Sequence, residues 1–181
     1  MNRQPLIAHI PALRRYARAL TGEAWACDDL VQDTLERACA KWRLWLVGSD
    51  LRAWLFTIMH NLYVSQVRHR VRQGDLAHPL DLAELDQEPA APASSTDSAI
   101  DLQRCLLRLP EEQRVVLLLV TLEDLSYAEV AKITGVPVGT VMSRLSRARS
   151  RLQELMDASA TQATRSVAAT ESLAPPLRRL K

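Results

Sequence analysis

The chain of 181 residues lacks the features that stabilise small secreted, metal-bound or membrane domains. It has three cysteines and no CxxC pair, which argues against a disulfide scaffold and against a zinc ribbon. Its longest uninterrupted apolar run covers residues 115–120, whereas a membrane-spanning helix needs about 20 apolar residues. Three arginines between residues 14 and 18 stand where an export signal would be apolar. These absences together predict a protein of the reducing cytoplasm.

Glycine is also scarce, with only 5 in the chain. Alanine, leucine and arginine, which favour helices, are abundant instead. Hydrophobic residues make up 48% of the chain and charged residues 24%, a balance that is typical of folded globular proteins. Residues 1–73 show none of the alternation of strand and helix patterns that a receiver domain needs. The composition therefore predicts an all-α protein.

The net charge of +2 conceals blocks of different sign. Residues 1–73 carry 11 Lys and Arg against 6 Asp and Glu, whereas residues 74–99 carry 6 acids and no Lys or Arg. The acidic block also holds three prolines, so it cannot bury enough apolar surface to offset the entropy of ordering it. We therefore expect two small helical domains, residues 1–73 and 100–156, joined by a flexible acidic linker at 74–99. The Ala-, Thr- and Ser-rich tail at 157–181 is predicted to be disordered.

Apolar spacing in the first domain predicts three helices. The first spans about residues 5–20, the second starts near Asp28, and the third follows Asp50. The second helix has a polar side made up of Asp29, Gln32, Asp33 and Glu36. Two interpretations fit this side: a solvated face whose first-turn acids favour the helix dipole, or a surface that docks a basic partner.

Seven of the eight aromatic residues of the chain lie in this basic first domain. A basic groove with aromatic rings is a common way to hold single-stranded nucleic acid. The same rings could fill a small core, which is the interpretation we favour for Trp42 and Phe56. Trp54 and the loop before it are the stronger candidates for contact with bases.

The second domain contains the sharpest local signal, a helix-turn-helix pattern. Ser126 and Glu129 match a capping box, Gly135 is suited to end the helix that follows, and Pro137 prevents its continuation. The next helix has an apolar seam, and the residues that we expect to point away from it are Thr140, Ser143, Arg144, Arg147 and Arg151. Four arginines and no acid between residues 138 and 151 predict a recognition helix that enters the DNA major groove. A generic helical hairpin would explain the seam but not this face.

The apolar run at residues 115–120 has two possible structures. Taken alone, it is compatible with a buried strand. Pro110 and the two acids after it favour a helix start at this point, so we expect the run to be helical and to pack behind the helix-turn-helix.

Three strings occur in the order Asp28-Asp-Leu-Val-Gln32, Leu51-Arg-Ala-Trp-Leu-Phe-Thr-Ile58 and Gly139-Thr-Val-Met-Ser-Arg-Leu-Ser-Arg-Ala-Arg149. In this order they resemble the extracytoplasmic-function (ECF) sigma factors of bacteria, a small group of the sigma-70 family that holds only regions 2 and 4. The resemblance covers about residues 6–156. It implies a factor that directs core RNA polymerase to promoters, that is not an enzyme and that needs no cofactor or metal.

The resemblance also implies a role for each polar surface. The residues expected to dock on the clamp helices of the polymerase β′ subunit are Asp29, Gln32, Asp33 and Glu36, which favours the docking interpretation of this face. The residues expected to capture a flipped base of the −10 element and to hold the melted strand are Gly48, Ser49, Asp50, Trp54, Asn61 and Arg68. The residues expected to read the −35 element are Thr140, Ser143, Arg144 and Arg147, in a domain that also docks on the β flap. An anti-sigma factor is implied as a further partner, which would hold the protein inactive in the cytoplasm or near the membrane.

Two alternatives from other classes stay open at this point. A stand-alone helix-turn-helix regulator would bind duplex DNA without core polymerase. A metal or redox sensor would use the histidines and cysteines, which are His9, His60, His69, His78, Cys27, Cys39 and Cys105. Neither HExxH nor CxxC occurs among them.

Overall fold

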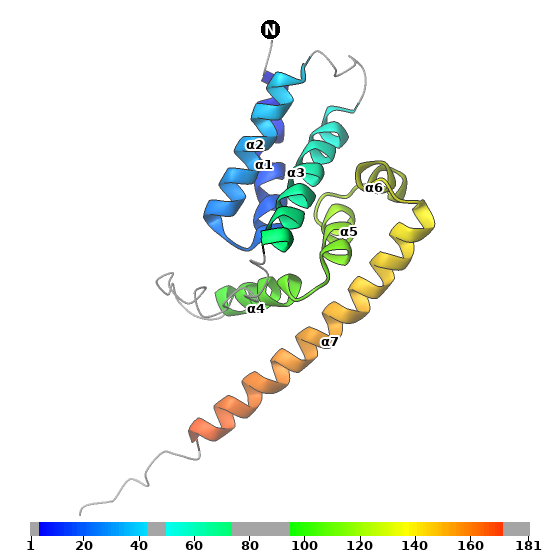
Figure 1. The fold of residues 1–181 in the computed structure, drawn as a ribbon. Coiled ribbons are helices and arrows are strands. Elements are labelled where there is room, and N and C mark those ends of the chain that lie inside the picture. The colour runs from blue at the N-terminus through cyan, green and yellow to red at the C-terminus, as the bar shows by residue number, and fades with distance from the viewer. Residues whose placement is uncertain (1–3, 43–49, 74–94, 172–181) are drawn as a thin grey trace, which may run out of the picture.

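The computed structural model describes residues 4–42, 50–73 and 95–171 (Figure 1). Its elements within these ranges are seven α-helices, with no β-strand. The helices are α1 (Gln4–Thr21), α2 (Ala24–Ala40), α3 (Leu51–Gln73), α4 (Ser95–Leu107), α5 (Glu111–Thr121), α6 (Tyr127–Thr134) and α7 (Val138–Glu171). The prediction of an all-α fold is confirmed.

The first domain is a bundle of α1, α2 and α3 around an apolar core. Leu13 on α1, Leu30 on α2 and Leu55 on α3 are fully buried, as the apolar spacing predicts. The rings of Tyr16 and Phe56 meet edge to face, with centroids 5.3 Å apart and planes at 88°, a favoured geometry for aromatic pairs. Phe56 is therefore a core residue, as expected.

The start of α2 differs from the prediction. Gly22 adopts a left-handed conformation (φ +83°) that ends α1, and α2 begins at Ala24, four residues before Asp28. Asp28 and Asp29 consequently lie in the second turn, and the first turn of α2 holds no acid. The explanation of these acids by the helix dipole is wrong, because that effect is confined to the first turn.

The second domain consists of α4 to α7. Val116 and Leu119 on α5 are fully buried, and the Pro110 carbonyl accepts the first hydrogen bonds of the helix from the Gln113 and Arg114 amides, both at 3.0 Å. The apolar run is thus a helix and not a strand. Helix α4 begins at Ser95, so residues 95–99 are helical, although we expected them to be part of the flexible linker. Residues 94–96, which fall within the predicted linker, are Ser, Ser and Thr, residue types that also favour a helix start. The rest of the predicted linker, residues 74–94, lies outside the described residues.

The helix-turn-helix forms through the predicted residues. The Glu129 amide donates to Ser126 Oγ at 3.3 Å, and the Ser126 amide donates to Glu129 Oε2 at 2.7 Å, which completes a capping box at the start of α6. Gly135 ends α6 in the left-handed conformation (φ +70°). The Pro137 carbonyl then accepts from the amides of Thr140 and Val141, at 2.9 and 3.1 Å, at the start of α7.

Gly135 offers a direct test of this turn. A Cβ at this position would meet no atom within 4 Å, so Gly135→Ala changes the backbone preference alone. We expect the free energy of unfolding to fall by about 1 kcal/mol, because an L-residue is strained at φ +70°. Gly139→Ala is the matched control: its Cβ also meets open space, but it lies in a helix, where alanine is favoured. Urea unfolding that gave equal stability for both variants would contradict this assignment.

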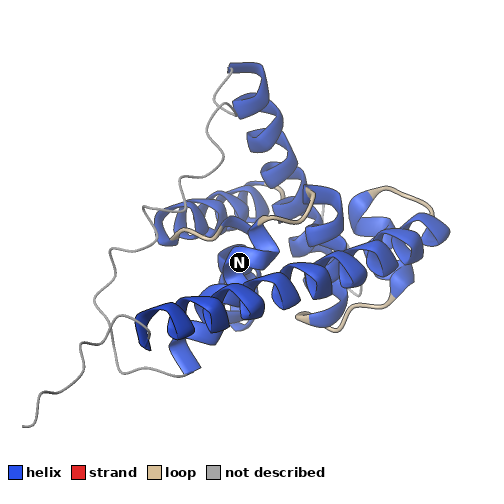
Figure 2. Ribbon diagram, turned by 90° about the horizontal axis from the view of Figure 1, so that it is seen from below, coloured by secondary structure: helices blue, strands red, loops and turns tan. Residues whose placement is uncertain are grey.

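Helix α7 is longer than predicted. It continues to Glu171, whereas residues 157–181 were expected to be disordered, so the expectation is wrong for 157–171. The physical reason is that extending a nucleated helix adds one hydrogen bond per residue without a new nucleus, and this segment is rich in alanine. Figure 1 shows the C-terminal half of α7 running well past the other helices, and Figure 2 shows the described segments as helices joined by loops. Residues 172–181 lie outside the described residues.

The two domains also pack against each other, which the sequence does not predict. Helix α1 contacts α4 and α5, and α3 contacts α6. The helix-turn-helix therefore lies directly beside the helix that carries Trp54 and Asn61.

Candidate nucleic-acid and partner interfaces

The outer face of α7 links three of the four residues that are predicted to read duplex DNA. Ser143 Oγ donates to the Thr140 carbonyl at 3.0 Å, and Arg147 Nη2 donates to Ser143 Oγ at 3.3 Å. The Arg147 side chain is exposed, whereas Thr140 and Ser143 are half-buried. Together they form a polar strip along the first turns of the helix, the part of a recognition helix that contacts base edges.

Arg144, the fourth predicted reader, does not point outward. Its side chain is 20% exposed, and its Nη2 pairs with Glu112 Oε2 of α5 at 2.5 Å. Position 144 lies three residues after Val141 and four before Ala148, both fully buried, so its side chain flanks the seam. The expectation that Arg144 points away from the seam is therefore wrong.

One exposed residue on the same helix was not among the predicted readers. Met142 is 52% exposed, and an apolar side chain on a recognition helix can contact the methyl group of thymine. The sequence could have marked Met142, because it is an apolar residue that lies outside the apolar seam, on an otherwise polar face.

In the first domain, Asn61 opens onto a basic cleft between α2 and α3. The cleft has a volume of about 230 Å³ and is lined by Arg37, Lys41, Ile58, Asn61, Leu62 and Ser65. Arg37, in the last turn of α2, and Lys41, which caps its C-terminal end, were not among the predicted residues. A basic cleft with amide and hydroxyl groups suits a nucleic-acid backbone.

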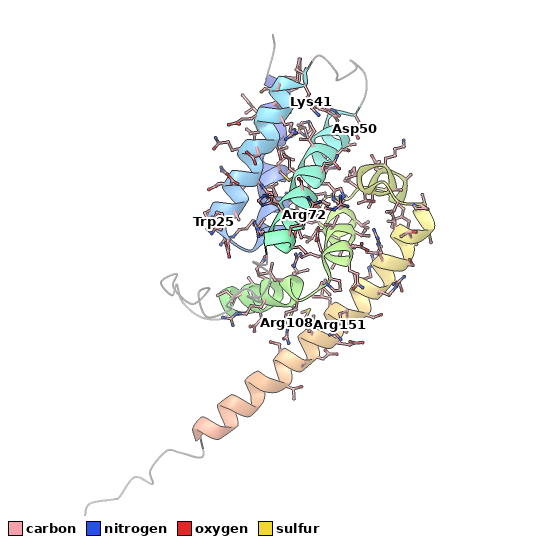
Figure 3. The ribbon with its side chains drawn as sticks, viewed as in Figure 1. Trp25, Lys41, Asp50, Arg72, Arg108 and Arg151 are labelled. Atoms are coloured by element: carbon pink, nitrogen blue, oxygen red, sulfur yellow. The ribbon has the colours of Figure 1, made fainter. Side chains whose placement is uncertain are left out.

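The other residues predicted to bind the −10 strand are dispersed. Trp54 is half-buried and packs against the core, while Arg68 turns to a different cleft, facing Glu111 of α5. Asp50 Oδ1 accepts from the amides of Arg52 and Ala53, at 2.9 and 3.2 Å, and so caps α3. Figure 3 shows Asp50 and Lys41 at the same end of the domain. Gly48 and Ser49 lie outside the described residues.

The polar side of α2 is an acidic surface. Asp29, Gln32 and Glu36 are exposed, and Gln32 Nε2 donates to Glu36 Oε1 at 3.0 Å. Asp33 is half-buried and accepts from Gln66 Nε2 of α3 at 3.5 Å. Partial burial, helped by the nearby Asp29 and Glu36, raises the pKa of Asp33. A surface that gathers three carboxylates, two of them exposed, is suited to a basic partner.

Comparison with known proteins agrees with this geometry. A family model described as the Sigma2 domain of PhyR matches residues 6–60, and one described as Sigma-70, region 4 matches residues 99–152. The ECF RNA polymerase sigma factor EcfG of Rhodopseudomonas palustris is 40% identical over 154 residues, which are 85% of this chain and 84% of the relative. The chain belongs to the ECF family of RNA polymerase sigma factors.

Further relatives support the same family. The ECF sigma factor SigM of Mycobacterium tuberculosis is 33% identical over 148 residues, which cover 82% of this chain and 73% of the relative. Among solved structures, the sigma factor RpoE of Bartonella quintana, in complex with the anti-sigma factor NepR, superposes with a TM-score of 0.70. That superposition covers 86% of this sigma factor and 96% of the relative, at 37% identity.

The family and the structure both bear on the alternative of a metal or redox sensor. The family consists of sigma factors, which are not enzymes in the catalytic sense. In the ranges that the structure describes, no group of three or more His, Cys, Asp or Glu residues is placed to hold a metal ion. Burial raises the pKa of the Cys27 and Cys105 thiols, whereas a reactive cysteine needs a lowered one. No helix among the described residues of this sigma factor is long and apolar enough to cross a membrane.

A second cleft of the sigma factor lies between its two domains. Its volume is about 260 Å³, and its charged and titratable lining residues are His60, Arg68, Glu111, Glu112 and Arg144. Burial is the main cause that lowers the pKa of His60, and the positive charges of Arg144 and Arg68 lower it further. The imidazole therefore takes up a proton less readily than a free histidine does.

This cleft makes the stability of the sigma factor depend on pH. In the unfolded chain, a histidine takes up a proton near pH 6.5. In the folded protein His60 has a lower pKa, so below this pH the unfolded state binds about one proton more than the folded state. Stability should therefore fall as the pH drops below that value. Burial raises the pKa of Glu111, so this residue makes stability rise as the pH drops. The variant His60→Gln therefore serves to separate the contribution of His60 from that of Glu111. We expect the melting temperature of the wild type to fall more than that of His60→Gln between about pH 7.5 and pH 5.5. Parallel falls would show that His60 is not responsible.

Proposed function

We propose that this ECF sigma factor uses both domains to bring core RNA polymerase to a promoter. Residues 1–73 act as region 2, which binds the polymerase and the −10 element, and residues 100–156 act as region 4, which binds the −35 element. The family matches at 6–60 and 99–152 support this division. The sigma factor itself catalyses no reaction; the polymerase does.

The polar strip on α7 is the observation that carries this proposal. Thr140, Ser143 and Arg147 are linked by hydrogen bonds on the outer face of a capped helix-turn-helix. Arginine can form a bidentate contact with guanine, and hydroxyl groups bind base edges or phosphates. We assign −35 recognition to these residues, with Met142 beside them. In the free protein Arg144 pairs with Glu112 and so ties α7 to α5. It would have to leave Glu112 to contact DNA.

The cleft between α2 and α3 is our proposed path for the −10 strand. Asn61, Arg37 and Lys41 line it, and Asp50 lies at the same end of the domain as Lys41 (Figure 3). We assign capture of the flipped base to Gly48, Ser49 and Asp50. Trp54 borders this path where it meets the core. Arg68 borders it on the side of the cleft between the domains.

The acidic side of α2 is our proposed docking surface for the polymerase β′ clamp helices. Asp29, Gln32 and Glu36 are exposed there, with Asp33 beside them. The sigma factor RpoE has been solved in complex with the anti-sigma factor NepR, and CnrH in complex with the cytosolic domain of CnrY. We extend such control to this chain: an anti-sigma factor that covers the docking surface would hold it inactive, in the cytoplasm or beside the membrane.

Run-off transcription on fragmented genomic DNA tests the function. We expect discrete new transcripts when the protein is added to bacterial core polymerase, with start sites that share a −10 and a −35 element. Binding to duplex DNA without core, and no transcripts with it, would instead indicate a stand-alone regulator.

A charge reversal tests the docking surface. Glu36→Lys should weaken core binding at least about tenfold, because like charges across an interface repel. Asp157→Lys on exposed α7 is the matched control. Equal core affinities for the two variants would remove the docking role.

A second candidate is favoured by the match of the first domain to the Sigma2 domain of PhyR. PhyR of Bartonella quintana is described as an anti-anti-sigma factor. A protein of that kind would bind an anti-sigma factor in place of a sigma factor and would not bind core polymerase. The core-binding measurement separates the two, and the DNA-binding strip on α7 favours the sigma factor.

A further inference from the structure

Glu123, just after α5, is the most deeply buried charged residue at the domain interface. Its side chain is 0% exposed, and both cations that pair with it belong to the first domain. Arg15 Nη2 of α1 lies 2.9 Å from Glu123 Oε1, and Arg52 Nη2 of α3 lies 2.9 Å from Oε2. The next residue, Asp124, has a left-handed backbone (φ +49°). The loop therefore turns directly after Glu123, whose side chain lies against the first domain.

The two arginines are anchored in the first domain and also bind the backbone of the second. Arg52 Nη2 donates to the Glu123 carbonyl at 2.5 Å, and Arg15 Nη2 donates to the Leu122 carbonyl at 3.4 Å. The Arg52 guanidinium lies 5.7 Å from the centre of the Phe56 ring, a core residue of the first domain. Glu123 thus connects the second domain to the core of the first.

Three further contacts close the same interface. Arg114 Nη2 of α5 donates to Tyr63 Oη of α3 at 2.8 Å, and both residues are buried. Gln103 Nε2 of α4 donates to the Ala19 carbonyl of α1 at 3.2 Å. A Cβ at Gly22 would lie 2.6 Å from Leu107 Cδ1, so the α1–α2 turn is packed tightly against α4.

This closed arrangement cannot occupy both promoter elements. The −10 and −35 elements lie about 25 base pairs apart, or on the order of 85 Å along the duplex at 3.4 Å per base pair. Helix α3, which lines the proposed −10 path, is in direct contact with α6 of the helix-turn-helix. The domains must therefore separate before the promoter is bound at both sites.

We propose that the closed arrangement is a resting state of the free protein and that Glu123 is the latch that holds it, so that opening limits promoter binding. The inhibitory part of this inference rests on the proposed function. A buried carboxylate is stable only when it is paired, and both of its partners are lost together when the domains separate. In the open state the loop reaches water, which solvates all three charges. The latch therefore favours fully closed or fully open molecules over intermediate ones.

Charge reversal of the latch tests closure in the full-length protein. Glu123→Lys places a cation against Arg15 and Arg52, and the double variant Arg15→Glu/Arg52→Glu surrounds Glu123 with acids. We expect each to raise the radius of gyration from small-angle X-ray scattering, with unchanged helix content by circular dichroism. Combining all three substitutions restores opposite charges and should return the radius towards the wild-type value. Glu154→Lys, an exposed acid on α7, is the matched control and should leave it unchanged.

Run-off transcription at limiting sigma factor tests the inhibition. If about one molecule in ten is open at rest, complete opening raises the apparent affinity about tenfold, so the two opened variants should give more transcript than the wild type. Variants as compact as the wild type, or a wild type that is already extended, would overturn the latch. Opened variants with no gain in transcript would overturn the inhibition. If the wild type gives no transcript at all, the proposed function fails, and the scattering still decides whether Glu123 closes the domains.

Discussion

Arg114→Met is expected to lower the free energy of unfolding by about 3 kcal/mol. Arg114 is only 9% exposed, and its guanidinium donates to the Leu107 carbonyl at 2.9 Å, to the Leu106 carbonyl at 3.5 Å and to Tyr63 Oη at 2.8 Å. The two carbonyls lie at the end of α4, where the helix itself provides no donor. Methionine keeps the aliphatic stem and its packing but removes the donor to the Leu107 carbonyl and to Tyr63 Oη. The Leu106 carbonyl keeps the hydrogen bond that it accepts from the Leu109 amide at 3.1 Å.

Urea unfolding followed by circular dichroism measures this loss. Arg108→Met is the matched control, because Arg108 is exposed one residue after α4 and one before the buried Leu109. Tyr63→Phe removes only the acceptor in the first domain and should cost about 1 kcal/mol. A similar loss for Arg114→Met and Tyr63→Phe would show that Arg114 stabilises the interface between the domains and not the end of α4.

The features that the sequence predicts are those encoded within a few residues. The capping box at Ser126 and Glu129, the left-handed Gly135 and the buried face of α5 all depend on neighbours in the chain, so residue type and spacing determine them. The same reasoning identified the polar strip at Thr140, Ser143 and Arg147.

Errors arise where a local pattern has two possible outcomes. The Ser-Ser-Thr run at 94–96 suits a linker and also a helix start, and the structure begins α4 at Ser95. The Ala-rich segment after Asp157 suits a disordered tail and also the continuation of α7. In both cases the adjoining helix extends into the segment, because extending a helix needs no new nucleus.

Contacts between segments far apart in the chain were not predictable. Glu123 is separated by 108 residues from Arg15 and by 71 from Arg52, and nothing in its local sequence marks it as buried. Arg144 was misplaced for the same reason, since its partner Glu112 lies on another helix. Arg37 and Lys41 could have been noticed as two bases four residues apart, but only the packing of α3 against the end of α2 makes them a cleft with Asn61.

Arg147→Ala should weaken binding of the holoenzyme to its −35 element by about 1–3 kcal/mol, mainly at one base pair. The exposed guanidinium of Arg147 is held by Ser143 on the outer face of α7. To reach a base edge it has to give up at most its 3.3 Å hydrogen bond to Ser143 Oγ. Arg144, which the sequence alone would favour for this role, must first leave Glu112.

The measurement is the affinity of holoenzyme for duplexes that carry single substitutions across the −35 element. Wild type should discriminate at the contacted position, and Arg147→Ala should bind all duplexes there about equally. Arg151→Ala is the matched control, because Arg151 lies one turn after Arg147 on α7 (Figure 3) and pairs with Glu154 at 3.2 Å. A uniform loss over all duplexes, with the salt slope reduced by about 1, would make Arg147 a phosphate contact. Sequence reading at this face would then fall to Ser143 and the exposed Met142.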